Sequence, residues 1–483
     1  MLDDLINERL KKLNRLKELG YNPYPPRVRK SHDIGRAVKN FSALAKTKKK
    51  IFVAGRVAGL RAQGGLMFAD LKDASGTIQL VIKKDALDNF DDFRDTLDIG
   101  DFLETGGTLF KTKRGEKSIE VDSLKFIVKS LRPVPSDWYG LEDVEVRLRQ
   151  RYLDLLANPG VRQIFVKKTE FWSAFRSLLK NEGFLEVETP ILEAVPGGAD
   201  AEPFLTHHNA LNTDFYLRIS LEIALKKLLV GGFEKIFEVG RIFRNEGIDA
   251  EHLQDYTQLE FYWAFHDYQD LMVLVEKLYK QVIKKTTGGL LTSWQGKKIN
   301  WGKSWPEISY YDIFEKMVGL DLNSAALDEL RRKAESAGLK PAANLNRGRL
   351  IDLLFKKFCR PTFIQPAFLI DPPVDIEPLA KRSPDSPNKV ERFQIMACQT
   401  ELGKGFSEAN DPIDQRQRFE EQMRLRAAGD AEAQRLDEDF LAALEYGMPP
   451  AAGFGVSERL FAVLMDRPVR ETVFFPLMRP KSS

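Results

Sequence analysis

The sequence predicts an α+β protein of two or three domains, in which a small β-barrel precedes a larger domain with an antiparallel sheet flanked by helices. The chain has 483 residues, and one domain takes roughly 150 residues. Five short β-rich runs occupy its first third. Long helices alternate with strands in the remainder, without the regular βαβ repeat of a parallel sheet. Hydrophobic residues make up 43% of the chain, which is enough for a large core.

An amphipathic helix is predicted at the start of the chain. Apolar residues recur there at three- and four-residue steps, and Gly20 is placed to end the helix: Leu2, Leu5, Ile6, Leu10, Leu13 and Leu16. Residues 1–60 also hold 15 Lys or Arg against 5 Asp or Glu, a net +10, whereas the whole chain carries +3. A polyanionic partner and a solvated basic face explain this equally well from charge alone.

The β-rich runs that follow predict an OB-fold barrel. They cover residues 51–57, 66–71, 77–82, 101–110 and 118–127, and turn signals such as Gly64-Gly65 and Ser75-Gly76 separate them. A helix over 86–97 is expected between the third and fourth strands, which is where OB barrels carry one. Such barrels also occur in proteins that bind no nucleic acid, so the fold by itself predicts no ligand.

The larger domain is expected to begin with a long helix. From Val161 onward the apolar positions Ile164, Phe171, Phe175 and Leu178 share one helix face. Gly183 ends this helix before a strand expected over 184–189.

Several classes of protein are not expected from this sequence. The longest charge-free stretch, 446–457, has 12 residues with two prolines and three glycines, too short to span a bilayer. The sequence is charged from Asp3 onward and has no apolar run before a small-residue cleavage site, so no secretory signal is expected. No GxxxxGK[ST] loop is present. Cys359 and Cys398 have no metal-ligand spacing. We therefore expect a cytoplasmic protein without a membrane partner, whose side chains grip any phosphate that it binds.

A hairpin over 235–265 carries the densest set of chemically useful side chains. Alternation places one guanidinium and several acids or tyrosines on a single polar face: Glu238, Gly240, Ile242, Arg244 and Glu246 on its first strand, and Tyr256, Gln258, Glu260 and Tyr262 on its second. The opposite face, with Leu259, Phe261, Trp263 and Phe265, should pack on the core, and Gly240 should leave empty volume beside the charges. Arg is suited to gripping phosphate or carboxylate through two hydrogen bonds. Ion pairs on a wet sheet face remain the alternative for any single residue.

Two further clusters extend this predicted site. In the segment 401–408, Glu401, Gly403 and Gly405 should share one strand face that offers a carboxylate beside room for a ligand, and Glu408 follows a bend. In the segment 453–461, Ser457 is placed to cap a helix whose first turn carries Arg459.

In this order, the clusters resemble class II lysyl-tRNA synthetases of bacterial type. The resemblance runs from about Ile51 to Pro480, and residues 320–349 match poorly. The segments that carry it are Glu186-Val-Glu-Thr-Pro190 (motif 1), Phe243-Arg-Asn-Glu-Gly247 (motif 2) and the segment ending at Arg459 (motif 3). Those that resemble the lysyl enzymes in particular are Pro196-Gly-Gly-Ala199, Thr206-His-His-Asn-Ala-Leu211, Tyr216-Leu-Arg-Ile219, Gly405-Phe-Ser-Glu408 and Phe475-Pro-Leu-Met-Arg-Pro480.

The resemblance implies four parts of the chain. They are a helical, basic extension (1–48), an OB-fold anticodon-binding domain (49–130), a linker (131–145) and a class II catalytic domain with motifs 1, 2 and 3 (146–483). It also implies that lysine and ATP give lysyl-adenylate and diphosphate, that the lysyl group passes to the 3′ end of tRNA(Lys), that Mg²⁺ assists, and that motif 1 holds a homodimer together.

Site residues follow from the resemblance position by position. Arg244 and Arg459 would be catalytic, and ATP would be bound by Arg244, Glu246, His252, Tyr256 and Arg459. Lysine would be bound by Gly198, Glu222, Arg244, Glu260, Tyr262, Phe406 and Glu408. Glu401 would hold Mg²⁺ with Gln394 beside it, and Arg61, Phe68 and Gln79 would read the anticodon.

Four positions depart from the family pattern. Gln394 replaces a second metal-binding glutamate, so that one Mg²⁺ is lost or held through water. Lys404 replaces an asparagine and would repel the substrate or pair with Glu408 or Glu401. Glu251 replaces a phosphate-binding arginine, and Glu458 replaces an aspartate. The alternatives are an aspartyl- or asparaginyl-tRNA synthetase of the same subclass and a catalytically impaired tRNA-binding paralogue. Glu408 argues against an acidic substrate unless another cation offsets its charge.

Overall fold

The computed structural model describes residues 2–134, 143–247, 252–430 and 432–480. It divides into two compact units, Met1–Glu142 and Asp143–Ser483. Residues 135–142 of the predicted linker, and Glu251, lie outside the described part. No helix in the described ranges is both long and apolar enough to cross a membrane.

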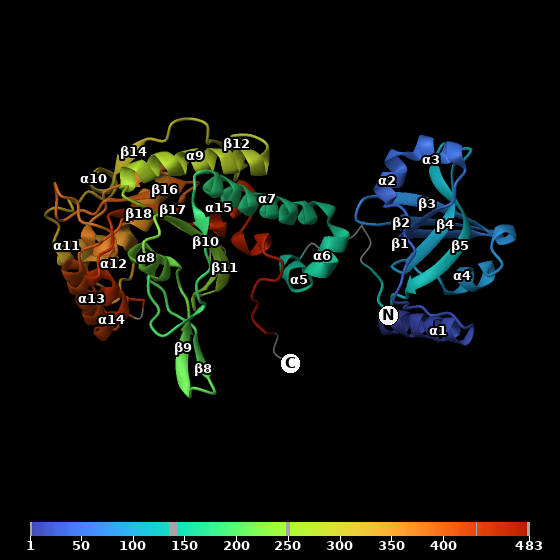
Figure 1. The fold of residues 1–483 in the computed structure, drawn as a ribbon, viewed down its shortest axis with the longest axis horizontal. Coiled ribbons are helices and arrows are strands. Elements are labelled where there is room, and N and C mark those ends of the chain that lie inside the picture. Colours follow the sequence, from blue (N-terminus) through green and yellow to red (C-terminus); the bar gives the residue numbers. More distant parts are fainter. Residues whose placement is uncertain (1, 135–142, 248–251, 431, 481–483) are drawn as a thin grey trace. The chain divides into compact units, whose positions relative to one another are not determined.

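The first unit is built around a closed five-stranded barrel, as the sequence predicts (Figure 1). Its strands are β1 (Ile51–Gln63), β2 (Leu66–Lys72), β3 (Thr77–Lys83), β4 (Phe102–Lys111) and β5 (Lys117–Val128), in the order β1-β2-β3-β5-β4. Alternate residues such as Met67, Ala69 and Leu71 fill the interior, which excludes water from one face of each strand.

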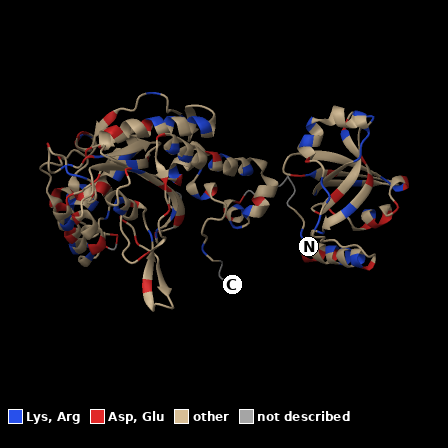
Figure 2. Ribbon diagram, viewed as in Figure 1, with Lys and Arg blue, Asp and Glu red and all other residues tan. Residues whose placement is uncertain are grey.

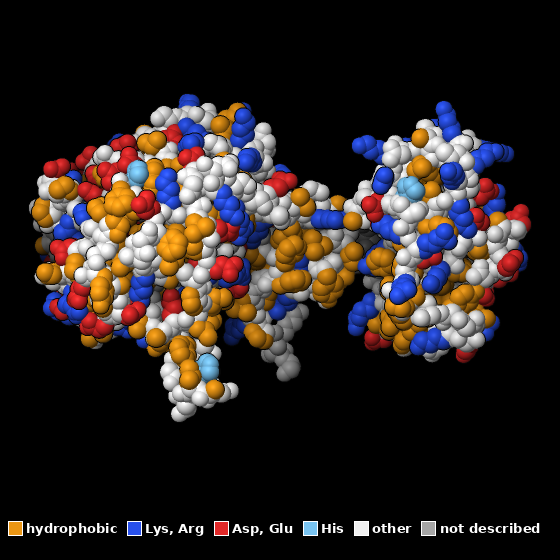
Figure 3. Space-filling view, viewed as in Figure 1, with side chains coloured by type: hydrophobic (Ala, Val, Ile, Leu, Met, Phe, Trp, Pro, Cys, Tyr) orange, Lys and Arg blue, Asp and Glu red, His pale blue; other side chains and the backbone are white. Residues whose placement is uncertain are grey.

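Four helices accompany the barrel. The predicted opening helix is confirmed as α1 (Leu2–Glu18), and α2 (Ile34–Lys39) and α3 (Phe41–Thr47) follow it. The helix predicted over 86–97 is shorter: a 3₁₀ turn (Lys84–Ala86) comes first, and α4 spans only Phe90–Thr96. Phe90 and Phe93 of α4 are buried in the barrel core. Figures 2 and 3 show Lys and Arg gathered at the end of the unit where α2 and α3 lie.

An eight-stranded sheet forms the centre of the second unit. Its order is β14-β15-β16-β17-β18-β11-β10-β6. The strands are β6 (Leu185–Glu186), β10 (Lys235–Phe243), β11 (Asp255–Ala264), β14 (Glu307–Ser309), β15 (Ala367–Ile370), β16 (Arg392–Ala397), β17 (Thr400–Ser407) and β18 (Ala451–Ser457). The six central strands are antiparallel, as predicted, whereas β14 and β6 add parallel edges. Two small sheets lie apart, β7 (Leu192–Glu193) with β9 (Thr213–Leu217) and β8 (Leu205–His208), and β12 (Leu291–Trp294) with β13 (Lys297–Asn300).

The second unit also contains helices, several of which cover the sheet (Figure 1). They are α5 (Val144–Arg149), α6 (Arg151–Ala157), α7 (Pro159–Asn181), α8 (Glu222–Val230), α9 (Tyr268–Thr287), α10 (Tyr310–Val318), α11 (Leu327–Ser336), α12 (Arg347–Leu354), α13 (Pro412–Ala427), α14 (Glu438–Glu445) and α15 (Glu458–Leu464). The predicted apolar face of α7 is confirmed, because Phe171, Phe175 and Leu178 pack with α9 and one face of the sheet in the main core. A second apolar cluster joins the other face of the sheet to α8, α13 and α14, and polar groups lie beside that cluster.

Two local predictions in this unit are wrong. The strand expected over 184–189 pairs with β10 at only two residues, because the chain leaves the sheet after Glu186. Phe265 does not pack on the core with Phe261. It lies beyond the end of β11 in a left-handed conformation with φ +63°, and 63% of its surface is exposed.

Candidate active site

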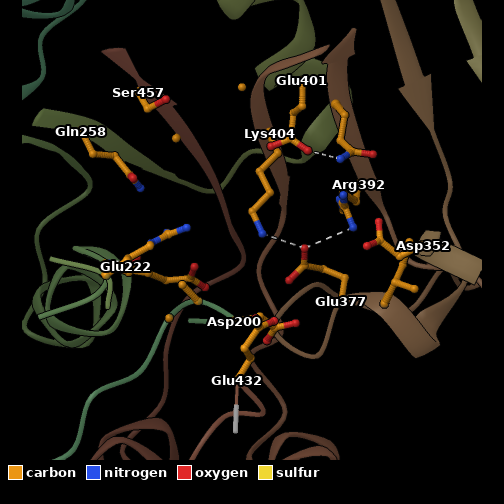
Figure 4. Close-up of a pocket in the computed structure, with 18 of the residues that line it drawn as sticks. Asp200, Glu222, Gln258, Asp352, Glu377, Arg392, Glu401, Lys404, Glu432 and Ser457 are labelled. Atoms are coloured by element: carbon orange, nitrogen blue, oxygen red, sulfur yellow. Dashed lines mark hydrogen bonds and ion pairs between the residues drawn. The ribbon is translucent and has the colours of Figure 1, made fainter. Parts of the chain in front are cut away.

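A cavity of about 740 Å³ opens on the polar face of the large sheet. Most of the predicted site residues of the second unit line it together: Gly198, Glu222, Arg244, Glu246, His252, Tyr256, Glu260, Tyr262, Gln394, Glu401, Phe406 and Arg459. Glu408 is the exception, since it is buried just behind this lining. Strands β11, β17 and β18 form the floor, and α8 and α12 contribute walls. Figure 4 shows acids and bases pointing into the same space from several of these elements.

One end of the cavity is acidic and is organised by Glu260 on β11. Oε1 of Glu260 accepts hydrogen bonds from Ser220 Oγ (2.8 Å), the Leu221 amide (3.1 Å) and Gln258 Nε2 (2.6 Å). Oε2 accepts one from Tyr262 Oη at 3.0 Å. Because this hydroxyl donates its proton to Glu260, its lone pairs stay available to a cation. Burial, with Glu260 beside it, raises the pKa of Tyr262 well above its ordinary value and keeps it neutral.

Two more carboxylates flank a buried lysine at this end. Lys226 Nζ lies 2.5 Å from Oε1 of Glu222, one turn earlier on α8, and forms an ion pair with Oε2 of Glu408. Oε1 of Glu408 is buried and has no hydrogen-bond partner among the described residues. Burial raises the pKa of Glu222 to about 7 and that of Glu408 well above its ordinary value, against the opposing pull of Lys226. Two carboxylates thus share one ammonium group, and the hydrogen bonds that Glu260 accepts come from neutral groups.

Two glycines make this acidic end possible. Gly198 has φ +85°, and a Cβ there would lie 2.9 Å from the Cβ atoms of both Ser220 and Glu222. A Cβ at Gly453 would lie 2.3 Å from Oε1 of Glu408 and 2.4 Å from the Tyr262 ring. Both positions therefore exclude any larger residue, and Oε1 of Glu408 lies beside the ring of Tyr262.

The other end of the cavity is basic. Nε of Arg244 donates to the Ile219 carbonyl at 3.2 Å, and its guanidinium carbon lies 5.8 Å from the centroid of the Tyr256 ring. Arg459 donates to the Glu401 carbonyl at 3.3 Å, and its buried Nε has no partner among the described atoms. As predicted, Ser457 caps α15 by accepting a hydrogen bond from the Arg459 amide at 3.3 Å. Two guanidinium groups beside an aromatic ring suit an anionic ligand with a planar group.

Glu401 is the one predicted metal ligand that carries a charge. Gln394 donates a hydrogen bond to Oε2 of Glu401 across β16 and β17. Burial alone would raise the pKa of this carboxyl, but Arg392, Lys404 and Arg459 hold it below its ordinary value. Among the described residues, no three His, Cys, Asp or Glu side chains cluster as a metal site. Any ion here would take most of its ligands from a bound molecule.

The structure corrects the expected partners of Lys404. Its ammonium lies 3.0 Å from Oε2 of Glu377, and Arg392 approaches the same oxygen at 3.3 Å. Figure 4 shows both cations pointing toward Glu377, with Glu222 on the opposite side of the cavity. Lys404 therefore pairs with neither Glu408 nor Glu401. Because sequence alternation indicates only which residues share a face, Glu377, which comes from a distant turn, was not expected.

Three glycine assignments are also wrong. The space beside Gly240 is filled, since a Cβ there would lie 2.3 Å from the Arg218 guanidinium. Gly403 and Gly405 face the core, where a Cβ would meet Tyr279 and Leu271, respectively.

Gly403 faces the core because the register of β17 shifts where it pairs with β16. Met396 pairs with Glu401 and Ile395 with Gly403, so one extra residue is inserted between them. Such a bulge breaks the simple alternation of faces. The side chains of Lys404 and Phe406 therefore line the cavity together with Glu401, and Gly403 borders it as well, whereas Gly405 does not.

The polar face of the predicted hairpin is shorter than expected. Strand β10 ends at Phe243, so that Arg244 and Glu246 lie in the segment after the strand. The Arg244 amide still donates to the Gln254 carbonyl at 2.8 Å, which fixes the start of this segment. Glu458, one of the departures from the family pattern, is buried, lies 2.7 Å from Lys168 and accepts from the Thr257 amide at 3.0 Å.

The three predicted anticodon residues lie in the first unit. Arg61 is directly opposite Phe68 in the β1–β2 register, and Gln79 is opposite Asp70, two residues from Phe68. They therefore share one face of the strands. Phe68 is half-buried and lies outside the barrel core, in contrast to its neighbours Met67 and Ala69. Gln79 accepts a hydrogen bond from Ser118 at 2.9 Å.

The sequence reasoning missed several charged residues of the cavity region, among them Lys226, Glu377 and Arg392. Only Lys226 had a usable signal, because it lies four residues after Glu222 on a helix, the spacing at which ion pairs form.

The fold and the cavity together define a class II tRNA synthetase: an antiparallel sheet with an acidic and a basic pocket, in one chain with an OB barrel. Residues 143–479 match the family described as tRNA synthetases class II (D, K and N), and residues 51–127 match the OB-fold nucleic acid binding domain.

Similar proteins carry a more specific name. A lysine–tRNA ligase of Roseiflexus sp. (strain RS-1) is 45% identical over 99% of this chain and 99% of its own length. The lysine–tRNA ligase of Moorella thermoacetica is also 45% identical, over 99% of this chain and 98% of its own length. The lysine–tRNA ligase of Nostoc punctiforme is 42% identical, over 100% of this chain and 89% of its own length. The chain belongs to the lysine–tRNA ligases of class II.

Proposed function

We propose that the protein activates lysine with ATP at this cavity and transfers the lysyl group to the 3′ end of tRNA(Lys). The observation that carries the proposal is the charge at the acidic end. Glu222 and Glu408 contact Lys226, and Glu260 accepts a hydrogen bond from the neutral Tyr262 hydroxyl, so that the three carboxylates, when ionised, leave two negative charges beside this ammonium. Lysine brings two ammonium groups, and a buried ammonium needs an anionic partner.

The same charge count argues against the aspartyl and asparaginyl alternatives. Lys226 is a cation that offsets Glu408, the one condition under which an acidic substrate would be accepted. Glu222 and Glu260 nevertheless keep the pocket negative, and an aspartate side chain would add a further negative charge without a partner. Lys404, the departure from the family pattern that places a cation near the pocket, already binds Glu377.

Lysine-dependent exchange of diphosphate into ATP tests the proposed reaction. Run with each of the twenty amino acids, it should give exchange with lysine and little with aspartate or asparagine. Aspartate-dependent exchange would favour the alternative ligase. Absence of exchange with every amino acid would leave the tRNA-binding paralogue.

The proposed orientation of lysine follows from the free acceptors. Its side-chain ammonium would bind Oε1 of Glu408 and Oη of Tyr262, along the ring of Phe406. Its α-ammonium would lie between Glu222 and Glu260, next to the backbone of Gly198. The carboxylate would then point to the basic end, where Arg244 lies.

ATP would occupy the basic end. Arg244 would bridge the lysine carboxylate and the α-phosphate and neutralise charge that develops during transfer. Tyr256 offers a ring to stack on adenine, and Glu246 an acceptor for its amino group. His252 and Arg459 would contact the outer phosphates.

Magnesium fits this arrangement as a companion of ATP. Mg²⁺ in nucleotide sites is held by one or two carboxylates plus phosphate oxygens, and Glu401 supplies one ionised carboxylate with Gln394 as a neutral neighbour. When bound, the ion neutralises phosphate charge. The residues of the chain orient the two reactants: Arg244 and Arg459 hold phosphates, and Glu222 and Glu260 hold the α-ammonium.

Lysine binding should weaken in acid. Glu222 has its pKa raised to about 7 by burial, and only its ionised form attracts the α-ammonium. We therefore expect the KM for lysine to rise as the pH falls below about 7, by close to tenfold per pH unit if one proton is bound. The KM for ATP should change less, because Glu401 has a lowered pKa and stays ionised. A lysine KM that is flat between about pH 6 and about pH 8 would contradict the assignment.

The barrel would bind the anticodon through the shared face of Arg61, Phe68 and Gln79. Stacking of a base on an aromatic side chain contributes about 1–3 kcal/mol. Phe68→Ala should therefore lower the kcat/KM for tRNA about tenfold or more and leave lysine-dependent exchange unchanged. Phe102→Ala, which removes another ring of the barrel, is the control. Equal losses in both assays for Phe68→Ala would indicate a defect in folding instead.

We further propose a homodimer and a cytoplasmic location. Exposed apolar side chains gather around motif 1 and the β8–β9 hairpin, which projects from the unit in Figure 1: Leu185, Ile191, Leu192, Leu205 and Leu211. A second copy covering them would remove this surface from water. The cytoplasm is where tRNA is charged, and the free thiols of Cys359 and Cys398 agree with a reducing compartment.

A further inference from the structure

Lys226 is given no contact with the substrate in the proposed lysine site, yet it lies between two of the carboxylates of that site. The side chain of Lys226 is fully buried, and its ammonium lies 5.3 Å from the centroid of the Phe406 ring. It contacts Glu222 and Glu408, the two carboxylates proposed for opposite ends of the substrate. A buried lysine is rare unless it is paired, and here both of its partners belong to the pocket.

Each carboxylate presents one oxygen to Lys226 and retains another. Lys226 takes Oε2 of Glu408, and Oε1 stays buried beside Tyr262 without a hydrogen-bond partner among the described residues. Lys226 also takes Oε1 of Glu222, and the Cβ atom of Glu222 lies close to Gly198. The ammonium therefore fixes which oxygen of each carboxylate faces a ligand.

We propose that Lys226 is a positioning residue that determines specificity for lysine: its ammonium orients Glu408 and Glu222 and sets the charge of the acidic end at two negative charges. The inference rests on the proposed function, and it concerns a residue that touches the carboxylates rather than the substrate. Without Lys226, the pocket would hold three carboxylates and no cation. One of them would then retain a proton that the substrate must displace.

Other charged groups do not replace Lys226. Glu377, near the 3₁₀ turn Val374–Ile376, is already paired with Lys404 and Arg392. Glu260 and Tyr262 on β11 add a carboxylate and a neutral hydroxyl. Lys404 on β17 lies near enough to influence Glu222, but its own contact is with Glu377. Lys226 is thus the single cation in direct contact with the acidic end among the described residues.

Lys226→Met tests the proposal, because methionine keeps most of the volume and loses the charge. We expect the lysine KM in diphosphate exchange to rise about tenfold or more, while the ATP KM stays within about twofold. The pH at which the lysine KM begins to rise should move to higher pH, because the carboxylates would hold a proton more tightly. Lys226→Arg, which keeps a cation, should restore much of the affinity and the original pH profile.

Lys227→Met is the matched control. The ammonium of Lys227 binds Asp439 at 2.6 Å outside the cavity, so its loss should change none of these values. A folded Lys226→Met enzyme with the wild-type lysine KM and pH profile would overturn the proposal, and so would an equal loss of ATP affinity. If wild-type enzyme itself shows no lysine-dependent exchange, the proposed function fails first, which separates the two claims.

A structure of the wild-type enzyme with lysine serves if Lys226→Met does not fold. The proposal predicts that the Lys226 ammonium remains on Oε2 of Glu408 while the substrate ammonium takes Oε1. Displacement of Lys226 from both carboxylates by the substrate would overturn it.

Discussion

Replacing Arg244 with alanine should reduce lysine-dependent diphosphate exchange at least about a hundredfold in kcat/KM, which corresponds to a loss of about 3 kcal/mol of transition-state stabilisation. The guanidinium is anchored at the Ile219 carbonyl and against Tyr256, so it is held in place before ATP binds. Such a preorganised cation is most effective where negative charge develops, which is at the α-phosphate.

The control for this variant is Arg241→Ala. Arg241 is an exposed arginine on β10, three residues before Arg244, and it pairs with Asp255 and does not line the cavity. Its loss should leave exchange nearly unchanged. Arg244→Lys should recover only part of the rate, because an ammonium cannot make the two parallel hydrogen bonds of a guanidinium. Near-normal exchange by Arg244→Ala would refute the role of this residue.

The second large effect is expected for Glu408→Gln. The amide has the size of the carboxylate but no charge, so the side-chain ammonium of lysine would be buried without its anion. Breaking a buried pair costs about 3–5 kcal/mol. We therefore expect the kcat/KM for lysine to fall at least about a hundredfold, chiefly through KM, with little change in the KM for ATP.

Thermal unfolding and a surface variant control for stability. Glu438→Gln removes an exposed carboxylate that pairs with Arg416, and it should behave as wild type. The two ligase specificities predict opposite results for Glu408→Gln. A gain in aspartate-dependent exchange would support an acidic substrate, whereas loss of lysine use without that gain supports the present assignment.

The elements with a clear period were the ones that the sequence could predict. Alternation along the first third of the chain was enough for the five barrel strands, because one face of each strand is buried. The apolar face of α7 was predictable for the same reason, with Phe171 and Phe175 one turn apart. The short strand Leu185–Glu186 exists only because it pairs with a second strand. The pattern of apolar residues in so short a segment was too brief to predict its bounds.

The candidate site was predicted in part, and the missing part has a common cause. Residues such as Glu260 and Tyr262 share a strand face, so their proximity follows from the chain itself. The bulge at β17 does not follow, since it depends on the pairing with β16. The position of Lys226 in the site was the hardest to predict from the sequence. Lys226 and Lys227 are adjacent residues of the same type, but the first is buried and the second is partly exposed.

The most direct test of the charge-matched pocket compares lysine with norleucine as the substrate for diphosphate exchange. The two amino acids have a similar aliphatic chain, and only lysine carries the side-chain ammonium that Glu408 and Tyr262 are proposed to bind. Norleucine would leave the second oxygen of Glu408 without a substrate ammonium. We therefore expect the kcat/KM for norleucine to lie at least about a hundredfold below that for lysine. Exchange with norleucine at a rate close to that with lysine would show that the pocket recognises the aliphatic chain instead, and would contradict the account.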